Sequence, residues 1–194
     1  MEVWLVRHGQ TDWNVQGKLQ GAADIPLNAR GEQQAKQCAD FLKQFSFDFI
    51  MTSPLQRAKK TAHIIADACQ VRLETTPLIA ERHFGVVEGM TFEERNRRYP
   101  TFDYPEAETY AQVQQRVQHI LQQWQQLQAE RIIAVSHGGF INALLYALTT
   151  GEQGTNKTHL QNGSITKIKW DGEQWTVLDV NNASHMEPVE LEES

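Results

Sequence analysis

Two segments of the sequence each place a histidine and a glycine directly after an apolar run. Residues 3–14 read VWLVRHGQTDWN, with Arg7 and His8 at the end of the run, and residues 131–139 read RIIAVSHGG, with His137 in the matching place. Guanidinium groups bind phosphate oxygens in pairs, and a neutral imidazole can act as a nucleophile. These residue types therefore indicate a phosphate-binding pocket, provided that the two runs end side by side.

An alternation of apolar runs and helical patterns surrounds these residues. We predict strands over 2–7, 47–53, 71–75, 131–135, 164–170 and 174–180, and helices over 29–44, 53–69, 107–128 and 139–148. Alternating strands and helices are typical of an α/β fold, and apolar runs without polar alternation suit parallel strands that are buried on both faces. The sequence therefore predicts a layered α/β sandwich in which helices flank a mostly parallel central sheet.

The predicted sheet brings the polar residues at its strand ends together. Ligands of open α/β sheets bind beyond the carboxyl ends of the strands, which is where His8, Ser53 and His137 leave the sheet. We expect Ser53 to cap the following helix with Pro54 at its first position, since proline needs no N–H there. Arg57 then lies in the first turn of that helix. Two arginines and two histidines are thus predicted to converge on one active site.

The composition excludes several classes of partner. The 194 residues carry a formal net charge of −6, with 40% hydrophobic and 22% charged residues, as in a globular protein with an acidic surface. Such a surface repels nucleic acid and anionic membranes, so neither is expected as a partner. No apolar run is long enough for a membrane span, and the first residues do not resemble a signal peptide. We expect a cytoplasmic protein with one domain over 1–180 and a polar acidic tail over 181–194.

Paired histidines can also hold a metal ion. No third His, Asp or Glu stands at ligand spacing near His8 and His137, and the arginines beside them would repel a divalent cation. The two cysteines, Cys38 and Cys69, fall inside predicted helices, so we expect buried thiols instead of a disulfide or a thiolate cluster. The sequence predicts no metal site and no other cofactor.

Four sequence blocks connect these observations to a known family. The blocks VRHGQTDWN, SPLQRAKKTA, ERHFGVVEG and VSHGG resemble the signature blocks of the histidine phosphatase superfamily, the phosphoglycerate-mutase-like proteins, and they appear in family order between residues 6 and 139. QG at 20–21, PLNARGEQQA at 26–35 and NGSI at 162–165 are similar to family positions as well. A match that is distributed over so much of the chain is specific.

The resemblance assigns roles to the convergent residues. It implies that His8 is the nucleophile, which forms a phosphohistidine, and that Glu81 donates a proton to the leaving group. It also implies that Arg7, Arg57 and His137 bind the phosphate. These roles suit phosphoryl transfer, which needs an in-line nucleophile and cations near the equatorial oxygens. Further candidate substrate-binding residues are Asn14, Gln20, Gly21 and Gly138.

A segment rich in arginine and aromatic residues, 82–108, is predicted to cover the pocket as a small lid. Within it, Arg82, Arg97 and Arg98 are candidate substrate-binding residues that would select the organic part of the substrate. A solvated, charged helix end explains the same pattern. Both interpretations stay open.

The residues and the resemblance together predict a metal-independent phosphatase that hydrolyses phosphomonoesters of a small metabolite. A cofactor-dependent phosphoglycerate mutase is the first alternative, although such mutases usually carry a longer insertion near 82–108, which excludes water from the phosphohistidine. A non-catalytic protein that binds a phosphorylated ligand is the second alternative, which the presence of both His8 and Glu81 disfavours. The natural substrate and the oligomeric state stay open, a homodimer included.

Overall fold

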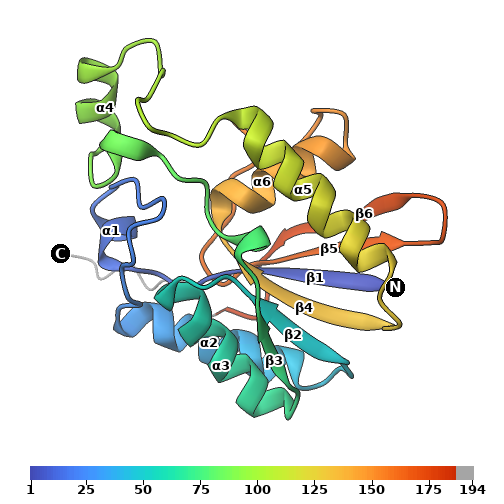
Figure 1. Cartoon of the computed structure of the whole chain (residues 1–194). Coiled ribbons are helices and arrows are strands. Elements are labelled where there is room, and N and C mark those ends of the chain that lie inside the picture. The colour runs from blue at the N-terminus through green and yellow to red at the C-terminus, as the bar shows by residue number, and fades with distance from the viewer. Residues whose placement is uncertain (187–194) are drawn as a thin grey trace.

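A single mixed sheet of six strands forms the centre of the protein. The computed structural model describes residues 1–186. Its strands are β1 (Glu2–Arg7), β2 (Phe49–Thr52), β3 (Leu73–Thr75), β4 (Arg131–Ser136), β5 (Ile165–Trp170) and β6 (Trp175–Asn182). They lie in the order β3-β2-β4-β1-β5-β6 (Figure 1). The strands β3, β2, β4 and β1 are parallel to one another, β5 is antiparallel to β1, and β6 is antiparallel to β5. The prediction of a mostly parallel central sheet is confirmed.

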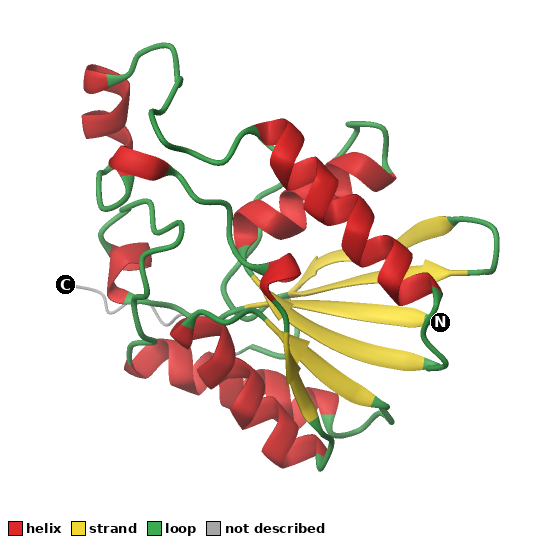
Figure 2. Ribbon diagram, in the orientation of Figure 1, coloured by secondary structure: helices red, strands yellow, loops and turns green. Residues whose placement is uncertain are grey.

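Helices cover both faces of this sheet. They are α1 (Asp12–Val15), α2 (Ala29–Leu42), α3 (Gln56–Cys69), α4 (Phe92–Arg98), α5 (Tyr110–Gln125) and α6 (Gly138–Leu148), with short 3-10 turns η1 (Pro77–Ile79) and η2 (Gly85–Val87). Alternate side chains of β1 point to opposite faces: Val3 and Leu5 join the core beneath α5 and α6, while Trp4 and Val6 join the core beneath α2 and α3. The predicted layered α/β fold is therefore confirmed (Figure 2).

The register of the parallel strands makes three of them end at one level. Arg7 of β1 lies opposite Ser136 of β4, and Thr52 of β2 lies opposite Val135. The ladder continues one step further, because the His8 N–H donates to the Ser136 carbonyl at 3.0 Å. His8, Ser53 and His137 therefore leave the sheet side by side.

The start of α3 differs from the prediction that Ser53 caps it. The helix begins at Gln56, and its N-cap residue, Leu55, makes no side-chain cap hydrogen bond. The Gln56 N–H donates instead to the carboxylate of Asp24, at 2.6 Å, so a distant acidic residue satisfies this free backbone donor. The expectation that Ser53 caps the helix with Pro54 at its first position was wrong, because a tertiary contact replaces the local cap.

Other element ends lie within a few residues of their predicted places. Asn28 caps α2 as predicted, since its side chain accepts the Gly31 N–H at 2.9 Å. The helix predicted over 107–128 is shorter, because a capping box between Thr109 and Gln112 starts α5 at Tyr110. The predicted tail, 181–194, overlaps the end of β6, and its residues 187–194 lie outside the described residues.

The segment 82–108 stands beyond the carboxyl ends of the strands, on the same side as α1 (Figure 1). It contains η2 and α4, and α4 carries a capping box between Thr91 and Glu94. None of the helices among residues 1–186 has both the length and the apolar character that a membrane span requires. The segment that was predicted as a lid is thus a connection with two short helical elements, η2 and α4, next to the strand ends.

Candidate active site

A cavity of about 270 Å³ lies at the carboxyl ends of the parallel strands. Among the residues singled out from the sequence, its walls include Arg7, His8, Asn14, Gln20, Gly21, Arg57, Glu81 and Gly138. His137 lies behind His8, fully buried, with a distance of 5.1 Å between the two ring centroids. The structure therefore brings both histidines, both arginines and the glutamate to one place.

The His8 side chain has one nitrogen tied to the backbone. Its Nδ1 lies 2.7 Å from the carbonyl oxygen of Gly9, and a carbonyl can only accept, so Nδ1 carries the ring proton. The Nε2 atom makes no hydrogen bond within the described part of the chain. Burial lowers the pKa of His8 well below its usual value, and the nearby charges of Arg57 and Arg7 lower it further. His8 is therefore a neutral imidazole with its Nε2 lone pair available.

The loop that carries His8 is fixed from two sides. The Gly9 N–H donates to the Thr61 hydroxyl at 3.1 Å, and the Asn162 amide donates to the carbonyls of His8 at 3.0 Å and Gly9 at 3.3 Å. A side chain at Gly9 would have to place its Cβ 2.3 Å from the Gly31 carbonyl oxygen, so only glycine fits there. Asn162 belongs to the NGSI block, but its contact with the His8 loop could not be predicted from that block.

The Arg57 guanidinium is held rigidly beside the cavity. Its Nη1 and Nη2 donate to the carbonyls of Ala23 and Gly21, both at 2.7 Å, and its Nε donates to Nδ1 of His137 at 3.2 Å. Burial lowers the pKa of Arg57, whereas the negative charge of Glu81 opposes that effect. The arrangement presents a positioned positive charge to the cavity.

The carboxylate of Glu88, which was not among the predicted site residues, holds the loop on which Arg57 depends. Glu88 accepts the N–H groups of Ala22 at 2.9 Å and Ala23 at 3.0 Å, and also the N–H of Phe84 at 2.9 Å. It therefore joins the loop beside Arg57 to the segment 82–108. The ERHFGVVEG block contains Glu88, and that is the signal that could have found it.

Arg7 supplies the second positive charge. Its Nη1 donates to the Leu160 carbonyl, and its Nε is buried without a partner among the described residues. Burial lowers the pKa of Arg7 while the charge of Glu81 raises it. The Arg7 guanidinium thus keeps one donor without a protein partner beside the cavity.

His137 uses both ring nitrogens within the protein. Its Nδ1 accepts from Arg57, so Nε2 carries the proton and donates to the Ser53 hydroxyl at 2.7 Å. Burial lowers the pKa of His137 well below its usual value, and the positive charges of Arg57 and Arg7 lower it further. The Ser53 hydroxyl thus orients His137 at the strand ends.

Glu81 lies against the first turn of α6. Its Oε2 accepts the Gly139 N–H at 3.0 Å, and its Oε1 accepts the N–H groups of Phe140 and Arg82, both at 2.9 Å. Backbone N–H groups at a helix N-terminus bind negative charge. They hold the Glu81 carboxylate in the cavity wall, in one orientation.

A pair of neighbouring glycines allows a test of this placement. A Cβ on Gly139 would lie 2.5 Å from Glu81 Oε1, whereas a Cβ on Gly138 would lie 3.4 Å from Arg7 Nε, an ordinary contact. Alanine is favoured over glycine inside a helix by about 1 kcal/mol, so neither variant should unfold. We expect Gly139→Ala to lower kcat on phosphate esters about 10- to 100-fold by moving Glu81, whereas Gly138→Ala, whose methyl group would meet Arg7 and not Glu81, should act mainly on KM. Equal kcat values for the two variants would contradict the placement of Glu81.

Two weaker candidates also line the cavity. The Asn14 side-chain oxygen accepts from Thr11 and from Asn162, so this end of its amide is occupied by local structure. Gln20 is buried, and its Oε1 has no partner among the described residues. Among the described residues, Gln20 thus has an acceptor without a partner, and the Asn14 Nδ2 is a donor that no hydrogen bond occupies.

A second cavity, of about 620 Å³, adjoins the first and shares Leu19 and Phe84 with it. Arg82 and Arg95 line it together with the aromatic residues Phe92, Phe102 and Tyr104. Arg97 and Arg98 line neither cavity; both are exposed in the last turn of α4. Arg95, which points to the Met90 carbonyl at 3.0 Å, is therefore the α4 arginine nearest to the ligand space.

Several residues of the first cavity carried no signal in the sequence analysis. They are Lys18, Leu19, Phe84, Asn142, Thr158, His159 and Leu160. His159 is the most notable, because it is an imidazole in the cavity wall that lies outside the four sequence blocks. Among residues 1–186 no group of three or more His, Cys, Asp or Glu side chains is arranged to hold a metal ion.

The fold and the cavity define an α/β protein that holds two arginines, two histidines and a carboxylate at the carboxyl edge of a mostly parallel sheet. The chain belongs to the histidine phosphatase superfamily (branch 1), whose family model matches residues 3–183.

Individual relatives cover almost the whole chain. It is 42% identical over 185 residues to the "Uncharacterized phosphatase PhoE" of Bacillus subtilis (strain 168), covering 95% of this chain and 96% of that protein. It is 34% identical over 211 residues to the "Probable phosphoglycerate mutase GpmB" of Shigella boydii serotype 4 (strain Sb227), covering 100% and 98%. Among solved structures, a phosphoserine phosphatase mutant of Entamoeba histolytica in complex with phosphoserine superposes with a TM-score of 0.84, at 31% identity and coverage of 95% and 98%.

Proposed function

We propose that the protein is a metal-independent phosphatase that hydrolyses phosphomonoesters through a phosphohistidine on His8. The observation that carries this proposal is the fixed tautomer of His8, whose Nδ1 donates to the Gly9 carbonyl at 2.7 Å. A neutral imidazole with a free Nε2 beside two arginines is a nucleophile placed where a phosphate dianion would bind.

In the first step, the Nε2 lone pair of His8 forms a bond to phosphorus while the bond from phosphorus to the ester oxygen breaks. Arg7 and Arg57 neutralise the charge that spreads over the equatorial oxygens. The Nδ1–H bond to Gly9 stabilises the positive charge that the ring acquires when Nε2 is phosphorylated. These cations supply the charge that a metal ion supplies in other phosphatases.

Glu81 handles the protons in both steps. Its carboxylate takes up the proton that a monoanionic phosphate ester brings into the cavity and passes it to the departing alcohol oxygen. The carboxylate that results then takes a proton from the water that attacks the phosphohistidine. That attack breaks the bond between phosphorus and Nε2, releases inorganic phosphate and restores neutral His8. Backbone contacts from Gly139 and Phe140 keep the carboxyl group in the cavity through both steps.

The substrate proposed is a small phosphorylated metabolite. The phosphoserine in the Entamoeba histolytica structure belongs to that protein, and it suggests the size of ligand that such a cavity takes. Isomerisation of a phosphoglycerate is the second candidate activity, because "Probable phosphoglycerate mutase GpmB" proteins match the whole chain.

We expect phosphate release from a panel of phosphomonoesters to persist in EDTA and to be inhibited by vanadate. Vanadate forms a five-coordinate adduct on a nucleophile, so it mimics the in-line transition state. The measurement is released phosphate, with isomerisation of 3-phosphoglycerate followed in parallel. Loss of turnover on chelation with recovery in magnesium or zinc would contradict the mechanism, and isomerisation that is faster than hydrolysis would favour the mutase.

A further inference from the structure

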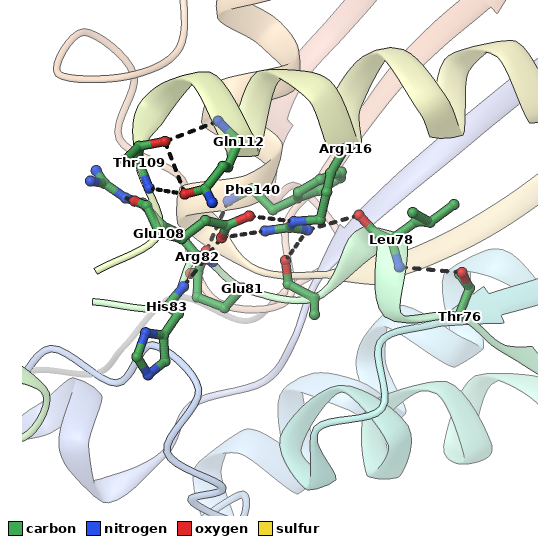
Figure 3. A network of polar contacts seen from close by, with 11 residues as sticks. Thr76, Leu78, Glu81, Arg82, His83, Glu108, Thr109, Gln112, Arg116 and Phe140 are labelled. Atoms are coloured by element: carbon green, nitrogen blue, oxygen red, sulfur yellow. Dashed lines mark hydrogen bonds and ion pairs between the residues drawn. The ribbon is translucent and has the colours of Figure 1, made fainter. Parts of the chain in front are cut away.

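A half-buried ion pair outside the cavity joins the two ends of the segment 82–108. Arg116, on α5, donates from Nε to Oε1 of Glu108 at 2.7 Å and from Nη2 to Oε2 at 2.8 Å, and the two side chains are only 20% and 16% exposed. This two-bond geometry fixes the direction of the guanidinium plane, which a lysine at this position would not do. We refer to this pair as the Arg116–Glu108 clip (Figure 3).

The third nitrogen of Arg116 reaches the chain directly before Glu81. Nη1 donates to the carbonyl of Leu78 at 2.9 Å and to the carbonyl of Ala80 at 3.0 Å. The Ala80 carbonyl belongs to the peptide group that precedes Glu81, so its hydrogen bond sets the direction in which the Glu81 backbone leaves this turn.

Arg116 also contacts the residue that binds the carboxylate of Glu81. Its guanidinium carbon lies 5.2 Å from the centroid of the Phe140 ring, and the Phe140 N–H donates to Glu81 Oε1 at 2.9 Å. A guanidinium over an aromatic face is an attractive contact. Arg116 thus contacts the peptide group that precedes Glu81 and the residue that binds the Glu81 carboxylate (Figure 3).

Glu108 extends the same connection to the other end of the segment. The Arg82 Nε donates to the Glu108 carbonyl at 2.8 Å, and the Glu108 N–H donates to the His83 carbonyl at 2.8 Å. Arg82 in turn donates its backbone N–H to Glu81 Oε1. The His83 N–H also donates to Oε2 of Glu108 at 3.4 Å, the oxygen that Arg116 Nη2 binds. The residues immediately after Glu81 are therefore held by Glu108, whose carboxylate Arg116 fixes.

We propose that Arg116 is a positioning residue for Glu81, which acts through the Arg116–Glu108 clip by fixing the backbone on both sides of Glu81. This inference rests on the proposed role of Glu81 as the proton donor. Its consequence is specific: loss of the clip impairs the protonation of a leaving group, and it leaves the attack of His8 on phosphorus intact.

The test compares Arg116→Met with a matched arginine elsewhere. Arg131 donates to the Glu2 carboxylate at 3.1 Å and lies 5.4 Å from the Trp4 ring centroid, but it starts β4 at the end opposite His137. Both variants lose an ion pair and a contact with an aromatic ring. Thermal unfolding should report a loss of stability for each, whereas only Arg116→Met should change the dependence of the rate on the leaving group.

The measurement is the rate of His8 phosphorylation by glycerol phosphate and by p-nitrophenyl phosphate, because nitrophenolate leaves without a proton. We expect Arg116→Met to slow the alkyl ester about 10- to 100-fold and the nitrophenyl ester less than about threefold, and Arg131→Met to slow both by similarly small factors. Combined with Glu81→Gln, Arg116→Met should add no further loss on the alkyl ester, because both changes remove the same step.

Separate outcomes identify which proposal fails. Equal losses on the two esters in Arg116→Met, or losses that multiply fully with those of Glu81→Gln, would overturn the positioning role. A Glu81→Gln enzyme that retains normal phosphorylation by the alkyl ester would overturn the proton donor itself. If Arg116→Met does not fold, Arg116→Lys and Glu108→Gln decide by the same comparison, since each removes the two-bond geometry and keeps most of the volume.

Discussion

His8→Ala should lower phosphate release by about 10⁴-fold or more in kcat, because His159, the other imidazole in the described lining of the first cavity, has no hydrogen bond that fixes a ring nitrogen toward phosphorus. The variant should still fold, since His8 contributes a single side-chain hydrogen bond, to the carbonyl of Gly9. Incubation with a phosphomonoester followed by mass spectrometry at alkaline pH should show one phosphoryl group on the wild-type chain and none on the variant.

His63→Ala provides the matched control. His63 is an exposed histidine on α3 and does not line the first cavity, so its removal should leave both turnover and phosphorylation unchanged. Near-normal turnover in His8→Ala would exclude the phosphohistidine route. A phosphoryl group that persists in this variant would assign the nucleophile to another residue.

The convergence of His8 and His137 could be predicted because it depends only on the ends of two buried strands. Each apolar run stops at a polar residue, and neighbouring parallel strands in a layered α/β fold end at the same edge. The observed pairing of Arg7 with Ser136 is the register that this reasoning requires. Local sequence therefore carried enough information for the core of the site.

The environment of these residues depends on contacts between distant segments, and these could not be predicted. Serine is a residue type that commonly caps helices, yet the Ser53 hydroxyl accepts a hydrogen bond from His137. The carboxylate of Asp24 accepts the hydrogen bond from the first turn of α3 instead. Nothing in the residues around Ser53 or Asp24 indicates that they meet partners from other parts of the chain. The choice between local and tertiary hydrogen bonds is made by packing.

The directions of the arginine side chains in the predicted lid, 82–108, could not be predicted either. The sequence predicts no regular helix around Arg97 and Arg98, only a lid or a charged helix end, and the direction in which these side chains point depends on how the segment 82–108 packs. The structure turns Arg95 toward the second cavity and leaves the other two exposed. Arg116 was missed for a similar reason, since on a glutamine-rich helix it is indistinguishable from a solvated charge until Glu108 is placed beside it.

Glu81→Gln should slow phosphorylation by alkyl phosphates about 10²- to 10⁴-fold, the usual contribution of a general acid. An alkoxide is a poor leaving group unless a proton reaches it in the transition state, and glutamine has no proton to give. The same variant should be phosphorylated by p-nitrophenyl phosphate at nearly the normal rate, because nitrophenolate is stable without protonation. Rapid mixing with each ester separates the two cases.

The second half of the cycle gives this variant a further signature. Glutamine cannot take the proton of the water that attacks the phosphohistidine, so the nitrophenyl ester should give a burst of nitrophenol followed by a slow steady state.

Glu81→Asp is the matched control, because it keeps a carboxyl group that stands one methylene further from the Gly139 and Phe140 N–H groups. It should recover part of the rate on alkyl esters and shorten the burst. Equal losses on both esters in the phosphorylation step would place the proton donor elsewhere in the cavity, and a rapid steady state without a burst would assign the activation of water to another base.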